Sequence, residues 1–174
     1  MSRFEELLST VETYQGLAAE NYARIRRLAQ EMREGLCGYL GATDGQCVHL
    51  VPPSGPFEPR SYGDHAFSIP PRGFRPLGPV QFGLAVRVSK GTDWLRLAME
   101  CRKSGEAFHV LMEGGREYTF ALPLAENDPA PFYGEIYDHV RDWFQERIDR
   151  YNEGDYGTRE IGFDFADGQT EVDV

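Results

Sequence analysis

The sequence predicts an α+β fold, an antiparallel β-meander of four to six strands packed by a long N-terminal helix and an amphipathic C-terminal helix. Three observations lead to this fold class. A heptad pattern runs through residues 1–40, alternating segments joined by short turns fill residues 79–123, and helical spacing follows residue 128. Since 174 residues is the size of one ordinary domain, we expect residues 1–174 to form a single domain.

Residues 1–40 predict a long helix or a helix pair, because apolar side chains recur in one unbroken heptad frame. Gly16 and a capping box from Ser9 to Glu12 mark the point where the helix could divide in two. The a and d positions hold Phe4, Leu7, Val11, Tyr14, Ala18, Ile25, Leu28, Met32 and Tyr39, with Asn21 and Gly35 as the exceptions.

This narrow apolar seam has two interpretations. Coiled-coil helices use such a seam for self-association, and one polar residue in it, here Asn21, can set register or oligomer state. The helix could instead pack on the protein's own sheet, with Asn21 at the margin. The predicted self-association residues are Phe4, Leu7, Val11, Tyr14, Asn21, Ile25 and Leu28.

Residues 41–78 predict an ordered Pro/Gly-rich loop with short strands near residues 47–51 and 66–69. Eight of the eleven prolines lie between residues 52 and 79, a density that neither a helix nor a central strand tolerates. We expect Phe74 to plug the core beneath this loop. Alternatively, residues 70–76 adopt polyproline II geometry, and Arg72, Phe74 and Arg75 contact an aromatic groove or an anionic ligand.

Residues 79–123 predict the meander itself. Apolar and polar side chains alternate in 81–89 and in 94–103, which is the pattern of a half-buried strand. Two further strands are predicted at 107–112 and 116–122. The connections are short and contain glycine, which indicates hairpins and not βαβ crossovers.

Residues 128–152 predict the C-terminal helix, with Asp128 as its N-cap and Pro129 at its first position. An edge strand and an acidic tail are expected over residues 159–174. The net charge of the chain is −10, and residues 124–174, with fourteen acidic side chains and four arginines, account for all of it. No basic cluster of the kind that binds nucleic acid directly is present in the sequence.

The predicted C-terminal helix carries a stripe of carboxylates on the side away from its apolar face. Such a stripe could contact a basic protein partner, hold a divalent cation or mimic a phosphate backbone. It could also be a solvated face that keeps the protein in solution. The stripe consists of Glu135, Asp138, Asp142, Glu146, Asp149 and Glu153.

Candidates for chemistry are few. Glu135 and His139, four residues apart with Asp138 and Asp142 nearby, are the candidate metal ligands, and two ligands on one helix are fewer than a transition-metal site requires. Asp64 and His65 could supply a general base from the Pro-rich loop. No nucleophile elbow or phosphate-binding loop is present, and we expect no cofactor.

The sequence also indicates the cellular setting. Three cysteines without CxxC spacing argue against a disulfide framework, so we expect reduced thiols. Residues 1–6 do not resemble a secretory leader, and the apolar runs are too short to span a bilayer. These observations predict a soluble cytoplasmic protein with no membrane contact.

The leading functional hypothesis is a non-enzymatic interaction protein that forms a homo-oligomer. It would contact a protein partner through the acidic helix face and the Pro-rich loop. One alternative is an enzyme that binds a small molecule in a pocket under residues 57–76, with Asp64, His65 and Arg72 as polar groups. A second alternative is an acidic nucleic-acid mimic.

Overall fold

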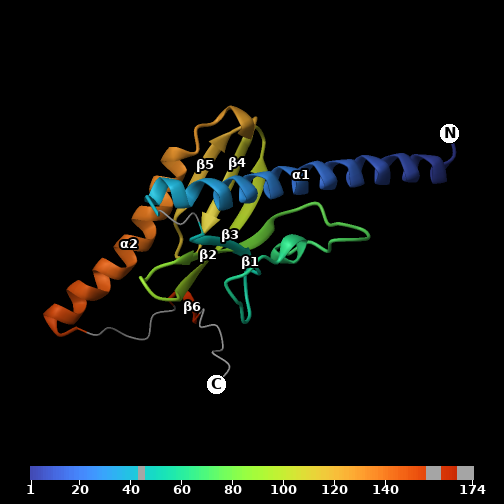
Figure 1. The fold of residues 1–174 in the computed structure, drawn as a ribbon. Coiled ribbons are helices and arrows are strands. Elements are labelled where there is room, and N and C mark those ends of the chain that lie inside the picture. Colours follow the sequence, from blue (N-terminus) through green and yellow to red (C-terminus); the bar gives the residue numbers. More distant parts are fainter. Residues whose placement is uncertain (43–45, 156–161, 168–174) are drawn as a thin grey trace, which may run out of the picture.

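The N-terminal helix is a single rod. The computed structural model describes residues 1–42, 46–155 and 162–167, and in it α1 (Arg3–Leu40) is one unbroken helix (Figure 1). Its capping box is formed by Ser2 and Glu5, with hydrogen bonds of 2.7 and 3.2 Å, so the box predicted at Ser9 is wrong. Gly16 does not divide the helix, because a single glycine costs only about 1 kcal/mol and good helix formers surround it.

Five strands form a meander in which every pair of neighbours in the chain is antiparallel and hydrogen-bonded. A sixth strand, β6, pairs with the first residues of β3, while β4 pairs with the last residues of β3. This confirms the predicted antiparallel meander. The strands are β1 (Val48–Val51), β2 (Val80–Arg87), β3 (Asp93–Ser104), β4 (Ala107–Met112), β5 (Glu117–Ala121) and β6 (Asp164–Asp167).

Some predicted segments fall outside the described residues. These are the start of the predicted last strand, residues 160 and 161, and the acidic tail over 168–174. The short strand predicted at 66–69 is reduced to one bridge between Phe67 and Phe82. Two 3₁₀ turns, η1 (Gly63–Ala66) and η2 (Leu124–Glu126), complete the described elements.

The core lies between one face of the sheet and both helices. Alternate residues of β2 and β3 point to this face, and their register places Phe82 opposite Met99 and Leu84 opposite Leu97. From α1 the buried side chains include Ile25. Both helices therefore cover the same face of the sheet, as Figure 1 shows. Within the described residues, no helix combines the length and the apolar character needed to cross a bilayer.

α2 (Ala130–Glu153) has its fully buried side chains in its first turns, and Val140, Trp143 and Phe144 farther along pack partly buried against the same core. Phe132, Tyr133 and Ile136 are its buried residues. The Tyr133 hydroxyl donates a hydrogen bond of 2.9 Å to the carbonyl of Glu31 in α1. Gly35 makes room for this ring, because a Cβ at that position would lie 2.6 Å from the Tyr133 oxygen. The later turns of α2 run away from the sheet (Figure 1).

The opposite face of the sheet carries a smaller cluster, which is covered by the first part of the Pro-rich loop. Phe57 from this loop packs with Val51, Ala85 and Trp94. The loop therefore does cover the sheet, but Phe57 is the plug on this far face. The prediction that Phe74 plugs the core is wrong, because that ring is 61% exposed.

Arg96 of β3 is buried in this second layer, with 2% of its surface exposed. Its guanidinium donates to the carbonyls of Pro52 and Gly55, at 3.3 and 2.6 Å, and to the carboxylate of Asp164 in β6, at 2.6 Å. It also lies 4.7 Å from the centre of the Phe57 ring. One cation thus ties the loop and β6 to the middle of the sheet.

The cysteine prediction requires a correction. Cys37, near the end of α1, and Cys47, just before β1, form a disulfide with their Cα atoms 5.7 Å apart. Spacing along the chain does not reveal such a pair, because the turn after α1 is what brings the two residues together. Cys101 is free and buried in the core, and burial raises the pKa of its thiol.

Candidate functional site

The first part of α1 projects beyond the rest of the molecule. We call residues 3–17 the arm, and none of them is buried, whereas nine residues from Ala18 onward are. The apolar seam nevertheless continues along the arm: Phe4 is 66% exposed, Leu7 is 58% exposed, and Leu8 is also exposed. Figure 1 shows the arm extending past the sheet, with the loop that precedes β2 beside it.

The base of the arm has one tertiary support, the end of the Pro-rich loop. The ring of Tyr14 stacks on Phe74 with their centres 5.5 Å apart and their planes nearly parallel. The Tyr14 hydroxyl accepts a hydrogen bond of 2.7 Å from the backbone N–H of Leu77. Phe74 and Leu77 stay exposed in this arrangement. They extend the apolar surface of the arm.

The remaining residues of the predicted self-association seam have another role. Ile25 and Leu28 lie in the protein's own core. Asn21 is also buried, and its side-chain amide donates a hydrogen bond of 3.0 Å to the carbonyl of Gly78. These three residues are therefore unavailable to a second copy in this conformation. The candidate self-association surface narrows to Phe4, Leu7, Leu8, Val11 and Tyr14, together with Phe74 and Leu77, and we call it the arm surface.

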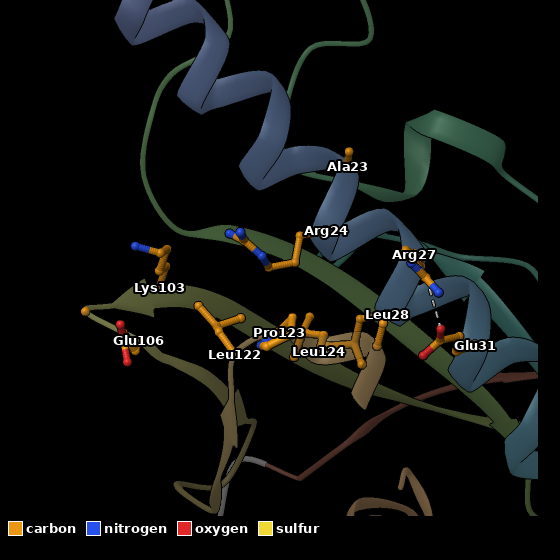
Figure 2. A pocket seen from close by; sticks show the side chains of 12 residues that line it. Ala23, Arg24, Arg27, Leu28, Glu31, Lys103, Glu106, Leu122, Pro123 and Leu124 are labelled. Atoms are coloured by element: carbon orange, nitrogen blue, oxygen red, sulfur yellow. Dashed lines mark hydrogen bonds and ion pairs between the residues drawn. The ribbon is translucent and has the colours of Figure 1, made fainter. Parts of the chain in front are cut away.

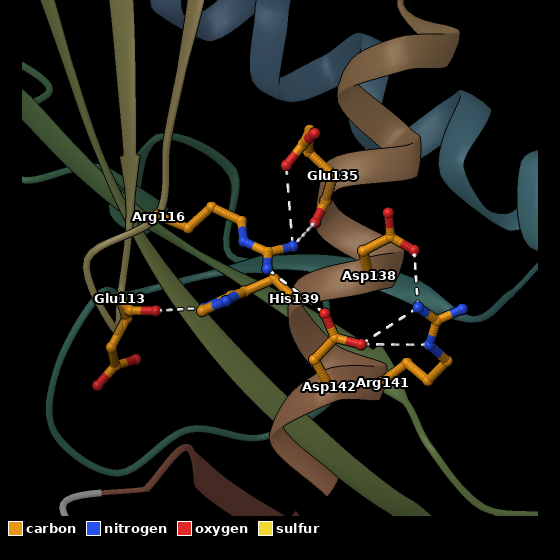
Figure 3. Close-up of polar contacts among 7 residues, drawn as sticks. All are labelled: Glu113, Arg116, Glu135, Asp138, His139, Arg141 and Asp142. Carbon is orange, nitrogen blue, oxygen red and sulfur yellow. Dashed lines mark hydrogen bonds and ion pairs between the residues drawn. The ribbon is translucent and has the colours of Figure 1, made fainter. Parts of the chain in front are cut away.

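The first half of the acidic stripe on α2 is neutralised within the molecule (Figure 3). Arg116, from the β4–β5 turn, lies 3.8 Å from the carboxylate of Glu135 and 3.5 Å from that of Asp142. Arg141 contacts Asp138 at 3.3 Å and Asp142 at 3.1 Å, and the hydrogen bond to Asp142 raises the pKa of Arg141. This part of the stripe is an ion-pair network.

The last turns of α2 have a different character. Glu146 pairs with Arg150 at 2.6 Å, and Asp149 accepts only from the Gln145 amide, at 3.0 Å. Glu153 and Asp149 are exposed and have no ion-pair partner among the described residues. Two large apolar side chains on the same turns are also exposed, Ile148 at 52% and Tyr151 at 65%. We call residues 145–153 the α2 end.

His139, one of the two predicted metal ligands, makes a hydrogen bond to the protein backbone instead. His139 Nε2 is hydrogen-bonded to the carbonyl of Glu113 (Figure 3). The His139 ring also meets Phe163 edge-on. The carboxylate of Glu135 faces Arg116 instead. In the described part of the chain, no three His, Cys, Asp or Glu side chains are grouped to hold a metal ion.

The predicted Asp64–His65 pair is not arranged for catalysis. Asp64 accepts a hydrogen bond of 3.1 Å from the Tyr22 hydroxyl and pairs with Arg26 at 3.4 Å, so its carboxylate is committed to α1. Burial, reinforced by this hydrogen bond, raises the pKa of Tyr22. The side chain of His65 is exposed to solvent. One hollow, of about 600 Å³, lies between α1 and Arg75 at the end of the predicted pocket region 57–76, and three further clefts lie beside α1 and α2.

Two of the three arginines of the Pro-rich loop, Arg72 and Arg75, differ in their contacts. Arg75 folds back on its own loop, where it donates to the carbonyls of Pro70 and Pro71, at 3.4 and 2.9 Å, and lies 4.6 Å from the centre of the Tyr22 ring. Arg72 is exposed. The loop is therefore braced against α1.

A groove that the sequence did not indicate lies beside the middle of α1 (Figure 2). Its volume is about 560 Å³, and it separates α1 from the turn between β3 and β4 and from the chain around η2. Leu28, Leu122 and Leu124 line it, while Arg24 and Lys103 lie at one end. Leu122 and Leu124 follow the last strand of the meander, and no periodic pattern distinguishes them from ordinary loop residues.

The sequence also did not predict the roles of Arg96 and Arg116, because both depend on contacts with other segments of the chain. The alternation predicted for residues 94–103 places Arg96 on the outer face of β3, but its burial depends on the loop after β1 folding over that face. Arg116 reaches α2 only because the β4–β5 turn lies beside it. A cation in a strand that follows a Pro-rich loop is a weak indication that Arg96 is buried.

Comparisons of the chain with known protein families, with curated proteins and with solved structures found no match.

Proposed function

We propose that this protein is a non-enzymatic interaction protein that self-associates through the arm surface and contacts a basic protein partner through the α2 end. The observation that carries the proposal is the row of exposed apolar side chains on the arm. Contiguous apolar patches on monomeric proteins are uncommon and often mark binding sites. The apolar positions of the heptad frame that pack α1 on the sheet continue along the arm, where no other element of the described chain covers Phe4, Leu7 and Leu8.

Stability considerations support a second copy as the occupant. A helix of about 15 residues is only marginally stable in water, so burial of one face would stabilise the arm. Complete burial of a Leu, Val or Phe side chain contributes about 1.5–3 kcal/mol. Four such side chains from each copy give at most about 12–24 kcal/mol, against roughly 4–15 kcal/mol lost on association. Because these totals are similar, we expect reversible, concentration-dependent association.

The test is sedimentation velocity over a range of protein concentrations. We expect the wild-type chain to form a larger species as concentration rises, and the double variant Leu7→Glu, Val11→Glu to remain monomeric. Ser9→Glu, Thr13→Glu is the matched control, because it adds the same charge to the opposite side of the same helix. The control should associate like the wild type. A wild-type chain that is monomeric throughout, or equal loss in both variants, would contradict the proposal.

The α2 end supports the second half of the proposal. Asp149 and Glu153 have no arginine to neutralise them in the described part of the chain. Ile148 and Tyr151 beside them offer apolar contact area. Interfaces combine such large side chains with a polar rim, and charge complementarity selects the partner. Basic partners are therefore favoured at this end of α2, in preference to its Arg-paired first half.

Charge reversal tests this surface with octalysine as a defined basic probe. We expect Asp149→Lys, Glu153→Lys to weaken octalysine binding by about tenfold at low salt, as measured by calorimetry. The control is Glu58→Lys, Glu126→Lys, which changes the net charge equally at exposed positions outside α2. The control should lose much less affinity. Equal losses in the two variants would show that only net charge matters, and the α2 end would then not be a site.

The predicted cytoplasmic location remains a prediction. The disulfide between Cys37 and Cys47 weighs against it, because cytosolic thiols are usually kept reduced. Mass spectrometry of the alkylated protein purified from its native source would decide this point.

A further inference from the structure

The groove beside α1 has the dimensions and lining of a small-molecule site. Its volume of about 560 Å³ lies within the range of roughly 300–1,000 Å³ typical of ligand pockets. Leu28 on α1 faces Leu122 and Leu124 across the groove, so its floor is apolar (Figure 2). None of the residues assigned to the arm surface or to the α2 end lines it.

Two cations, Arg24 and Lys103, lie at one end of this groove, and Glu106 of the β3–β4 turn lies at that end too (Figure 2). The guanidinium of Arg24 extends from α1 toward Lys103 at the end of β3 (Figure 2). Lys103 has no ion-pair partner among the described residues, and Arg24 pairs with Glu20 at 3.2 Å. A second hollow of about 420 Å³ adjoins the first, shares Arg24 and Lys103 with it, and adds Arg102. The two cations therefore lie where two hollows meet.

The other charges around the groove are partly compensated. At the far end Arg27 pairs with Glu31 at 3.3 Å. Glu106, in the β3–β4 turn, is the remaining carboxylate of the lining. The lining of the two hollows together carries a small positive excess, in a chain whose net charge is −10. An anion is thus attracted to this place more than to a surface with the average charge of the chain.

We propose that the groove binds a small amphipathic anion. Its acidic head group lies between Arg24 and Lys103, and its apolar tail lies along Leu28, Leu122 and Leu124. Each part of the ligand meets a matching part of the groove, which is the usual composition of a small-molecule site, an apolar lining with a few placed polar groups. This proposal does not depend on the self-association of the arm.

The test uses three ligands with the same ten-carbon tail, namely decanoate, decanol and decyltrimethylammonium. Calorimetric titrations below the micelle concentration should show decanoate binding at least about tenfold more tightly than decanol, and decyltrimethylammonium binding weakest. Acetate, which has the head group alone, should bind too weakly to detect. Equal affinity for decanoate and decanol would overturn the assignment of the head-group site.

The chain contains only two lysines, Lys90 and Lys103, which provides a matched pair of variants. Lys103→Glu should weaken decanoate binding by about tenfold, because it places a like charge beside the head group. Lys90→Glu, in the exposed β2–β3 turn, should change it by less than about twofold. Leu124→Asp should also weaken binding, because it interrupts the apolar floor. Equal effects of the two lysine variants would contradict the proposal.

Chemical labelling supplies a second readout. Acetylation of Lys103 should slow in the presence of decanoate, while acetylation of Lys90 should not. Repeating the titration with Leu7→Glu, Val11→Glu separates the groove from the arm surface, and affinity for decanoate should persist in this variant. Its loss there, or tighter binding of a glutamate-rich amphipathic peptide than of decanoate, would overturn the small-molecule assignment.

Discussion

Replacement of Arg96 by alanine is expected to lower the free energy of unfolding by about 3–5 kcal/mol. The guanidinium is buried and donates to two loop carbonyls and to the Asp164 carboxylate. Removing it leaves the Pro52 and Gly55 carbonyls without this donor, at roughly 1–3 kcal/mol for each buried group. The contact with the Phe57 ring is lost as well.

Urea unfolding measures this change, with Arg102→Ala as the control on the same face of the same strand. Arg102 is exposed, so its variant should stay within about 0.5 kcal/mol of the wild type. Hydrogen exchange adds a local readout, because β6 is tied to β3 through Asp164 and should exchange faster in Arg96→Ala. A loss below about 1 kcal/mol would show that Arg96 does not hold this layer together.

The Phe132→Ala variant is expected to lose about 3–5 kcal/mol. This ring is fully buried, and it packs against Tyr118 and Phe120 of β5 with ring centres 5.1 Å from each. Phe132 is one of three fully buried residues of α2, all in its first turns, whereas Val140, Trp143 and Phe144 add partly buried contacts with the core. The cavity would therefore weaken the attachment of the whole helix.

The matched control is Tyr137→Ala, which removes an exposed ring from the same helix. We expect it to change the unfolding free energy by less than about 1 kcal/mol, because little apolar surface is uncovered. Thermal or urea unfolding distinguishes the two variants. Similar losses in both would mean that helix propensity, and not the attachment of α2 to the sheet, governs stability here.

The fold was predictable because its elements have strong local patterns. The heptad frame of α1 and the alternation in β2 and β3 depend on neighbouring residues alone. So does the approximate start of α2, although its N-cap is Pro129 and not Asp128 as predicted.

The candidate binding surfaces were harder to predict from the sequence. Phe4, Leu7, Ile25 and Leu28 occupy equivalent positions of the same heptad frame. Ile25 and Leu28 are buried because the sheet lies beneath that part of α1, whereas Phe4 and Leu7 are exposed because the sheet does not extend that far.

The acidic stripe shows the same division. Its six carboxylates can be found from their spacing, but which of them are neutralised depends on an arginine brought from another element. Arg116 lies 19 residues before Glu135 along the chain, yet it reaches Glu135 and Asp142 because the β4–β5 turn lies beside α2. The α2 end therefore emerged as a separate surface only once the turn was placed.

The sequence alone thus determined the α+β class, the order of the elements and the positions of the apolar seam and the acidic helix, because these follow from side-chain periodicity within single segments. The tertiary structure decided the burial of Arg96, the Cys37–Cys47 disulfide, the exposure of the arm and the groove between Leu28 and Leu124. Each of these features depends on where segments that are separate along the chain lie in space, and tertiary packing, not local sequence pattern, sets that placement.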